Sequence, residues 1–238
     1  MNPQWARQIA IPGFGTVGQE KLKNSKVAVL GLGGVGGPAA LYLAASGIGS
    51  LMLVDGDVVE ASNLNRQILF SFSDLGKPKA KTAARHLLSH NPELMVEVVE
   101  KRVEERDMQP LLKGCHIVLD CFDRNRDRLA VNRVCLRQGI PAVHGFAQDF
   151  GGEIFAVMPG KSPCLACALD EGFPETEPTP VIGVATGIVG VAMASVAILS
   201  LTDLGTLPAG TRQIFDLAFT EIMKVPIEIN PHCPACGK

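Results

Sequence analysis

The chain has 238 residues, of which 47% are hydrophobic and 19% charged, and its formal net charge is −2. A chain of this length and composition can bury a substantial core, which excludes an intrinsically disordered protein. The nearly balanced charge, with no run of basic residues, gives no reason to expect nucleic acid or an acidic membrane surface as a partner.

Strands and helices are predicted to alternate along most of the chain. Short apolar runs predict strands at residues 27–30, 51–54, 95–99, 117–119, 142–143 and 154–157, and helices are predicted at 38–46, 77–89 and 124–138. Gly47 and Gly139 follow two of these helices, where glycine commonly ends a helix. The alternation predicts an α/β fold with a Rossmann-like sheet, mostly parallel, and helices on both faces.

Residues 181–201 carry no charge and are long enough to cross a bilayer. The segment is rich in Gly, Ala, Ser, Thr and Val and lacks a basic flank and an aromatic belt, so we predict a soluble helix buried on all sides and no membrane span. Gly183, Gly187 and Gly190 would let neighbouring backbones approach it closely. The proline-rich, acidic residues 172–180 before it predict an exposed loop.

A glycine-rich turn lies between the first predicted strand and helix. In the stretch GLGGVGG, Gly31, Gly33 and Gly36 match G-x-G-x-x-G, and Gly34 adds to the same turn. Glycines let backbone N–H groups at a helix start approach a phosphate closely. Asp55 ends the next strand, where an acid usually accepts hydrogen bonds from a ribose. Up to this point NAD, FAD and ATP fit the pattern equally well.

Two cations and a second acid distinguish among these nucleotides. Arg66 and Lys79 follow the turn, and a triphosphate that is being split needs its developing charge neutralised, whereas the pyrophosphate of a dinucleotide stays intact. Asp123 follows a predicted strand that ends at Asp120. Mg²⁺ takes one or two carboxylates plus phosphate oxygens, so Asp123 is predicted to face the magnesium, with Asp120 as a residue that caps or orients the loop.

These motifs together resemble the ThiF/MoeB/HesA family, the ubiquitin-activating-like adenylyltransferases of sulfur-carrier proteins. The resemblance runs from Trp5 to Cys236 and is carried by GLGGVGGPAALYLAASGIG, LVDGDVVEASNLNRQILF, GKPKA and VLDCFD. It implies ATP and Mg²⁺, a homodimer, and a small ubiquitin-like sulfur carrier ending in Gly-Gly as the substrate. The carrier's terminal carboxylate would attack the α-phosphate of ATP to give an acyl-adenylate and pyrophosphate, for thiamine or molybdopterin type biosynthesis.

The resemblance also assigns roles to residues. It implies that the turn glycines face the phosphates, that Asp55 holds the ribose and that Asp123 holds the metal. Nucleotide binding and charge neutralisation fall to a further group, Asn63, Arg66, Gln67 and Lys79. Arg7, in WARQIAI, matches the family arginine that reaches into the partner subunit's site.

The sequence departs from the family in two places. Many relatives carry a cysteine in the loop before the apolar helix, but here that loop reads PETEPTPVIGV. Cys115, Cys121 and Cys135 are instead predicted to be small buried apolar side chains. We therefore predict that sulfur arrives from a separate persulfide-bearing protein after adenylation. The second departure is Arg124, where relatives often have Asn.

The other four cysteines form two Cys-x-x-Cys pairs. Cys164 with Cys167 and Cys233 with Cys236 have the spacing of a structural four-thiolate zinc site. Because residues 1–10 form no apolar signal core, we expect a reducing cytoplasm, where paired cysteines bind metal. We predict one domain over 1–238, with a nucleotide-binding core at 1–160 and a zinc-tied portion at 161–238 that holds a crossover loop and the apolar helix.

Other functions stay open at this point. An NAD(P)-dependent Rossmann oxidoreductase would explain the glycine turn and Asp55 but would leave Arg66, Lys79 and Asp123 without a role. A family member could activate a small molecule or a tRNA base instead of a protein. A dimeric scaffold that binds nucleotide without turnover is the non-enzymatic alternative.

Overall fold

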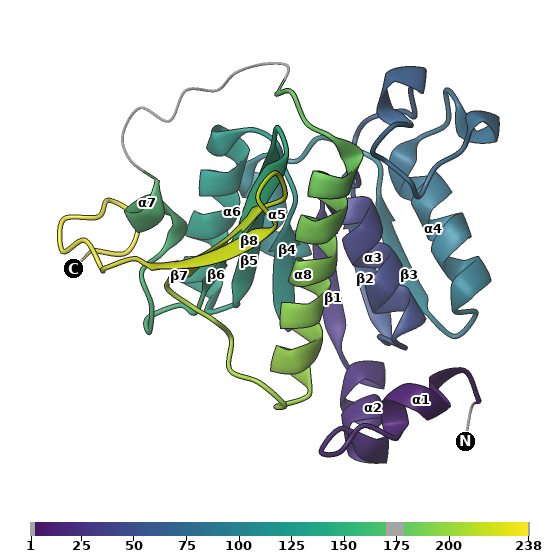
Figure 1. Ribbon diagram of the computed structural model, residues 1–238, viewed down its shortest axis with the longest axis horizontal. Helices are drawn as coiled ribbons and strands as arrows, with labels where there is room; N and C mark the ends of the chain where they lie inside the picture. Colours follow the sequence, from purple (N-terminus) through teal and green to yellow (C-terminus); the bar gives the residue numbers. More distant parts are fainter. Residues whose placement is uncertain (1–2, 170–178, 238) are drawn as a thin grey trace.

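The computed structural model describes residues 3–169 and 179–237, and within them eight strands form one mixed sheet (Figure 1). The strands are β1 (Lys26–Leu30), β2 (Ser50–Val54), β3 (Met95–Val99), β4 (Ile117–Asp120), β5 (Ala142–Gln148), β6 (Gly151–Val157), β7 (Thr211–Asp216) and β8 (Glu221–Pro226). Their spatial order is β3-β2-β1-β4-β5-β6-β7-β8. The five strands from β3 to β5 are parallel, and β6, β7 and β8 add antiparallel. The predicted α/β class with a mostly parallel sheet is confirmed.

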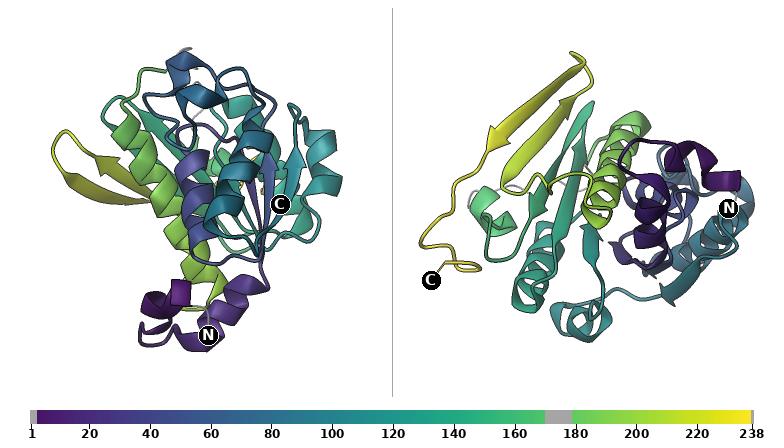
Figure 2. Two further views of the ribbon diagram at one scale, coloured as in Figure 1. Left: turned by 90° about the vertical axis from the view of Figure 1, so that its right-hand side faces the viewer. Right: turned by 90° about the horizontal axis from the view of Figure 1, so that it is seen from below.

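Helices cover both faces of this sheet (Figure 2). The α-helices are α1 (Ala6–Ile9), α2 (Gly15–Lys23), α3 (Gly36–Ala45), α4 (Lys79–His90), α5 (Glu105–Leu111), α6 (Asn125–Gln138), α7 (Leu165–Ala168) and α8 (Gly183–Leu201), and the 3-10 helices are η1 (Pro3–Trp5), η2 (Ala61–Asn63) and η3 (Phe72–Asp74). Val27 and Val29 of β1 pack with α3, α4 and α8, whereas Ala28 and Leu30 pack with α5 and α6. Because successive side chains alternate between two buried faces, the parallel strands read as continuous apolar runs.

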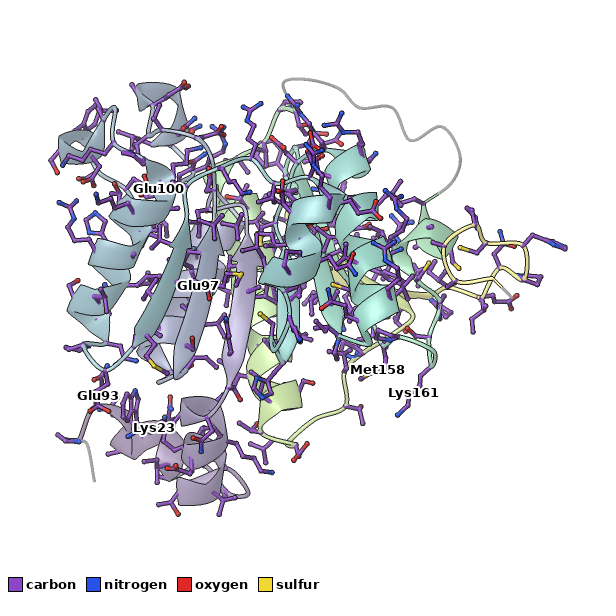
Figure 3. All side chains as sticks on the ribbon, turned by 180° about the vertical axis from the view of Figure 1, so that it is seen from behind. Lys23, Glu93, Glu97, Glu100, Met158 and Lys161 are labelled. Atoms are coloured by element: carbon purple, nitrogen blue, oxygen red, sulfur yellow. The ribbon has the colours of Figure 1, made fainter. Side chains whose placement is uncertain are left out.

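Several elements were not predicted from the sequence. Helices α1 and α2 pack below the sheet, where Trp5 Nε1 donates to the carbonyl oxygen of Ala45 (3.0 Å) and Lys23 lies beside Glu93 (3.5 Å, Figure 3). At the other edge, β7 and β8 form a hairpin that projects from the body of the molecule (Figure 2), and every residue of β8 is exposed. Most of the loop predicted at residues 172–180, namely residues 172–178, lies outside the described residues.

The apolar helix α8 forms as predicted, but the prediction that it is buried on all sides is wrong. One face packs on α3, β5 and β6, while Val184, Val191 and Leu199 on the opposite face are 63%, 39% and 41% exposed. The helix is long and apolar enough to span a membrane, with a mean hydropathy of 2.2, yet its packing is that of a core helix. The composition of a segment shows only that it is apolar. It does not show whether the helix packs against the protein on one face or on all sides.

Two of the three glycines predicted to allow close approach do so. A Cβ on Gly183 would overlap the carbonyl oxygen of Asn65, and one on Gly190 would overlap that of Val35, directly before α3. Gly187 has no atom of the described residues within 4 Å of a Cβ placed there, so the expectation for Gly187 is wrong.

This contrast predicts opposite effects of two alanine substitutions in α8. Gly190→Ala forces the backbones of α8 and α3 apart, so we expect the free energy of unfolding to fall by about 1–3 kcal/mol. Gly187→Ala should leave stability unchanged or raise it by up to about 1 kcal/mol, because alanine favours the helix. Urea unfolding of both variants measures this, and equal losses would contradict the packing described here.

Candidate functional site

A cleft of about 1300 Å³ opens where β1, β2, β4 and β5 end. Ligands of open α/β sheets bind at this edge, outside the carboxyl ends of the strands. Eight residues predicted from the sequence line it, namely Gly31, Gly33, Gly34, Asp55, Arg66, Gln67, Lys79 and Asp123. A second hollow of about 800 Å³ lies at the other end of β4, beside Cys115 and His116, and none of the predicted nucleotide residues lines it.

The turn between β1 and α3 is packed so closely at three of its glycines that a side chain would collide there. Gly31 has φ +88°, and a Cβ on it would lie 2.9 Å from the carbonyl oxygen of Cys121. A Cβ on Gly34 would lie 2.7 Å from Thr186 Oγ1, and one on Gly36 would overlap the carbonyl oxygen of Gly31. Gly36 does not line the cleft, so its place in the motif is explained by packing alone.

The same turn presents unused hydrogen-bond donors. Helix α3 begins at Gly36 without a side-chain cap, and the N–H groups of residues 33–36 donate to no described residue. A Cβ on Gly33 would meet only Gln67 Nε2, at 3.6 Å, so the turn is open at this residue. Free N–H groups and the positive end of a helix dipole together form an anion site that suits a phosphate.

Asp55 connects the end of β2 to this turn. Its Oδ2 accepts a hydrogen bond from Leu32 N (2.7 Å) and its Oδ1 one from Asp57 N (2.8 Å). Burial raises the pKa of Asp55, and the two amide hydrogen bonds and the charge of Lys79 act in the opposite direction. A carboxylate has about four acceptor sites, so the predicted bond from a ribose hydroxyl stays available.

Lys79 is the first residue of α4 and is only 6% exposed. Its Nζ lies 3.7 Å from Asp57 Oδ2, and Arg102 approaches the other oxygen of the same carboxylate at 3.1 Å. Asp57 therefore holds Lys79 toward the cleft. Asp57 was not predicted from the sequence, in which its only signal is its position two residues after Asp55.

Arg66 reaches the same cleft from the segment after η2. Its NH1 donates to Ser62 O (2.9 Å) and to Asn65 Oδ1 (3.1 Å), which hold the guanidinium in place. The structure thus brings both predicted cations to the cleft that the glycine turn lines. Their roles toward a polyphosphate stay predictions.

The two predicted amides near Arg66 differ in position. Gln67 is 4% exposed and lines the cleft, and its Oε1 is buried without a hydrogen-bond partner among the described residues. Asn63 does not line the cleft; its side chain caps η2 by accepting from Glu60 N (3.4 Å). In this structure Gln67 can reach a ligand, whereas Asn63 shapes the loop that carries its neighbours.

The two acids at the end of β4, Asp120 and Asp123, also differ in position. Asp123 is exposed, lines the cleft and has no hydrogen-bond partner within the described part of the chain, so its oxygens are free for a hard cation beside a phosphate. Asp120 is buried, and its Oδ1 accepts from Phe122 N (3.2 Å), which fits the predicted capping role. Two further residues near Phe122 were not predicted from the sequence, namely Arg128 and His144.

The four paired cysteines meet at the C-terminal edge of the molecule. Their Sγ atoms all lie within 4.8 Å of one another, with Cys164 and Cys233 3.6 Å apart and Cys167 and Cys236 3.4 Å apart. Four sulfurs at this spacing could bind zinc and leave it no open position, as in structural sites. The cluster connects the C-terminal segment to α7 (Figure 1).

The remaining cysteines are poor nucleophiles. Cys115 and Cys135 are buried, as predicted, and Cys121 is half-buried at the cleft. Burial raises the pKa of Cys115 to about 11 and raises the pKa of Cys121 and Cys135 as well. The thiolate is the reactive form, so these thiols stay largely unreactive at neutral pH.

Arg7 lies away from the cleft of its own chain. It is exposed on α1, and α1 packs on α2, which adjoins the N-terminal end of β1 (Figure 1). The cleft is at the opposite ends of the strands and Arg7 does not line it.

Comparison with known proteins agrees with this geometry. The chain is 38% identical to the SAMP-activating enzyme E1 of Haloferax volcanii, an alignment that covers 99% of this chain and 88% of the relative. It is 34% identical to the sulfur carrier protein ThiS adenylyltransferase of Escherichia coli K12, over 98% of this chain and 94% of the relative. The solved structure of E. coli MccB with ATP superposes with a TM-score of 0.89 and 26% identity, over 100% of this chain and 74% of that chain.

The family itself is matched along almost the whole chain, over residues 5–235. The matched range begins at η1 and ends in the cysteine cluster, so it includes the sheet, the cleft and α8. Named relatives of this type are adenylyltransferases. The chain therefore belongs to the ThiF family.

Proposed function

We propose that this chain is an ATP-dependent adenylyltransferase that activates the C-terminal carboxylate of a ubiquitin-like sulfur carrier ending in Gly-Gly. The product is an acyl-adenylate for thiamine or molybdopterin type biosynthesis. The carrier adenylyltransferases among its relatives support this proposal. The observation that carries it is that the open glycine turn, Arg66 and Lys79 line one cleft.

The residues of the cleft suit this chemistry. The carboxylate is already ionised at neutral pH, so the reaction needs no general base. A carboxylate oxygen forms a bond to the α-phosphorus, the bond from that phosphorus to the bridging oxygen breaks, and pyrophosphate leaves with the electron pair. Positioning and charge neutralisation supply the rate, for which the N–H groups of residues 33–36, Arg66 and Lys79 are arranged.

Magnesium and the carrier tail have separate places in this proposal. Asp123 would hold Mg²⁺, which when bound neutralises phosphate charge. The cleft continues from the glycine turn over the ends of β5, β6 and β7, past Gly152 and Phe219. A Cβ on Gly152 would overlap Val189 and the carbonyl oxygen of Phe146, so α8 and β5 fill that side of the strand. We place the carrier tail along this part of the cleft, because an extended Gly-Gly segment has no side chains to accommodate.

The proposal predicts carrier-dependent exchange of pyrophosphate into ATP. Lys79→Ala and Arg66→Ala should each lower kcat/KM for exchange on the order of 100-fold, because each removes a charge that stabilises the transition state. Lys81→Ala is the matched control, since Lys81 is exposed on the same helix and does not line the cleft.

The outcomes separate the alternative functions. Exchange without any carrier would mean that a small molecule or tRNA base is the substrate. An enzyme that binds NAD but does not bind ATP would support the oxidoreductase alternative. Full exchange activity in Lys79→Ala would contradict the proposal that Lys79 neutralises charge on the triphosphate.

We also propose that the enzyme is a homodimer. Val184, Ile188, Val191, Ser195 and Leu199 form a stripe on the exposed side of α8, at the spacing of one helix face. An exposed helix face with four apolar residues of five usually marks a contact surface, and we propose a second copy of the chain as its occupant. Arg7, which lies at the other end of the sheet from its own cleft, would then complete the partner's site.

A shared site of this kind predicts complementation between two inactive variants. Arg7→Ala lacks the residue that enters the partner's cleft, and Lys79→Ala lacks a residue of its own cleft, so each homodimer should be inactive. After unfolding and refolding together they should recover about a quarter of the wild-type rate, since about half of the dimers are mixed and each has one complete site. Sedimentation confirms the dimer, and no recovery in a mixture that does form dimers would contradict a shared site.

Zinc in the cysteine cluster is proposed as a structural ion. Cys164 precedes α7, and Asn132 of α6 accepts a hydrogen bond from Leu165 N through its Oδ1 (3.0 Å). Its Nδ2 is buried and makes no hydrogen bond to the described residues. Burial raises the pKa of Cys164, and the nearby Asn132 side chain acts in the opposite direction. A zinc-bound Cys164 thiolate would give this amide an acceptor. Reduced, metal-binding cysteines also favour the expected cytoplasmic location.

Asn132→Asp tests this arrangement because it keeps the acceptor for Leu165 N–H and removes the donor toward the sulfur. We expect zinc affinity, measured by competition with a chromogenic chelator, to fall by about 10-fold to 100-fold. Gln138→Glu makes the same kind of change near the end of α6 and should leave the affinity unchanged. Equal affinity in the two variants would show that Asn132 does not support the metal.

A further inference from the structure

The peptide groups beside Phe122 are held from both sides by buried side chains. Phe122 N donates to Asp120 Oδ1 (3.2 Å), and Phe122 O accepts from Arg128 Nε (2.6 Å). Asp120 is 0% and Arg128 8% exposed. Asp123 is the next residue, and its carboxylate makes no hydrogen bond to the described residues. The free carboxylate thus follows directly on a fixed stretch of backbone.

Asp120 is itself held by His144. The two residues are register partners in β4 and β5, and His144 Nδ1 lies 2.7 Å from Asp120 Oδ2. His144 is also 0% exposed. With one oxygen on Phe122 N and the other on His144, the Asp120 carboxylate has a fixed orientation.

Arg128 reaches a backbone carbonyl although acids are near. Its charge is influenced by Asp120, Asp123 and Glu153, but none of them forms an ion pair with it within 4.0 Å in the described part of the chain. The guanidinium instead lies 3.9 Å from the centre of the Phe146 ring, with Nε on Phe122 O. The hydrogen bond to Phe122 O provides the buried guanidinium with an acceptor. It also holds the loop that carries Phe122 in place.

The loop is also fixed against the glycine turn. Cys121 N donates to Leu30 O (2.8 Å), and the missing Cβ of Gly31 makes room for the carbonyl of Cys121. Because the loop and the turn touch here, a shift at Phe122 moves the Asp123 carboxylate relative to the phosphate-binding N–H groups.

We propose that Asp120, His144 and Arg128, named here the Phe122 clamp, are positioning residues that hold the Asp123 carboxylate where a nucleotide-bound divalent cation needs it. This inference rests on the proposed function, because it assigns the clamp to the metal used there. Residues that hydrogen-bond metal ligands typically affect metal affinity about 10-fold to 100-fold. The clamp acts through the backbone instead of through the ligand's own oxygens.

The test measures binding of Mn²⁺ by electron paramagnetic resonance in the presence of ATP and without any carrier. His144→Leu and Arg128→Met each remove one donor, and we expect each to weaken Mn²⁺ binding about 10-fold. His144→Asn places an amide donor near the former Nδ1 and should restore most of the affinity. Binding of ATP without metal should stay unchanged in both His144 variants. Arg128 lines the cleft, so for Arg128→Met the loss of Mn²⁺ affinity should exceed any loss of metal-free ATP affinity. Val134→Ala is the control, because Val134 is a buried apolar residue of the same helix as Arg128 and its side chain cannot hydrogen-bond to the Phe122 backbone.

The outcomes are distinct. Weakened Mn²⁺ binding in the two clamp variants, with normal binding in Val134→Ala at a similar loss of thermal stability, supports the clamp. Equal Mn²⁺ affinity in all of these variants overturns it, and if His144→Leu does not fold, Arg128→Met and His144→Asn decide the matter. Wild-type affinity in Asp123→Asn also overturns it. A wild-type enzyme that binds Mn²⁺ with ATP but activates no carrier contradicts the proposed function and leaves the clamp standing.

Discussion

The close backbone packing of the turn between β1 and α3 is the constraint on which the rest of the site depends. The turn lies against Cys121 on one side and against Thr186 of α8 on the other, and a side chain at Gly31, Gly34 or Gly36 would collide. No described residue accepts from the N–H groups of residues 33–36 at the start of α3, and residues 33–35 line the cleft. A phosphate can replace the water that otherwise accepts from these donors, so the packing and the anion site are one feature.

Two acids at strand ends use the same device to place this turn and the loop beside it. Asp55 after β2 accepts from Leu32 N, and Asp120 at the end of β4 accepts from Phe122 N. Asp55 thus fixes the backbone that follows the neighbouring strand β1, and Asp120 fixes the backbone that follows its own strand β4. Asp123 differs because its oxygens have no described partner, which leaves them available for a cation. Asp55 and Asp120 thus position the backbone of the site, whereas the Asp123 carboxylate is available to a ligand.

The parts predicted well from sequence are those whose signal is local. The strand at 27–30, the glycine turn and Asp55 lie within 30 residues of one another, and each has a pattern of its own. Arg66 and Lys79 were predicted from their order in the chain, and the structure brings both to the cleft. For Asn63 a nucleotide-binding role was implied by the family resemblance alone, and in the structure its side chain caps the local 3-10 helix. Order along the chain does not report side-chain direction.

The missed parts depend on tertiary contacts. Strands β7 and β8 are too polar to read as buried runs, because they add at an exposed edge of the sheet. Pro110 obscures the helical pattern of α5. The clamp on Phe122 joins Asp120, Arg128 and His144 from two strands and a helix, and no spacing in the sequence announces that these three meet at one loop.

The state of the thiols limits what this chain does after adenylation under the proposed function. The stretch PETEPTPVIGV contains no cysteine, and burial raises the pKa of each of the three cysteines outside the cluster. The other four are arranged as a closed set of metal ligands, which holds thiolates in coordination and away from substrate. Under the proposed function, these thiols are poorly suited to attack an acyl-adenylate formed in the cleft. We therefore propose that a thiolate or persulfide on another protein attacks the activated carboxyl group and displaces AMP, with the acyl-adenylate, a mixed anhydride, kept from water until that partner arrives.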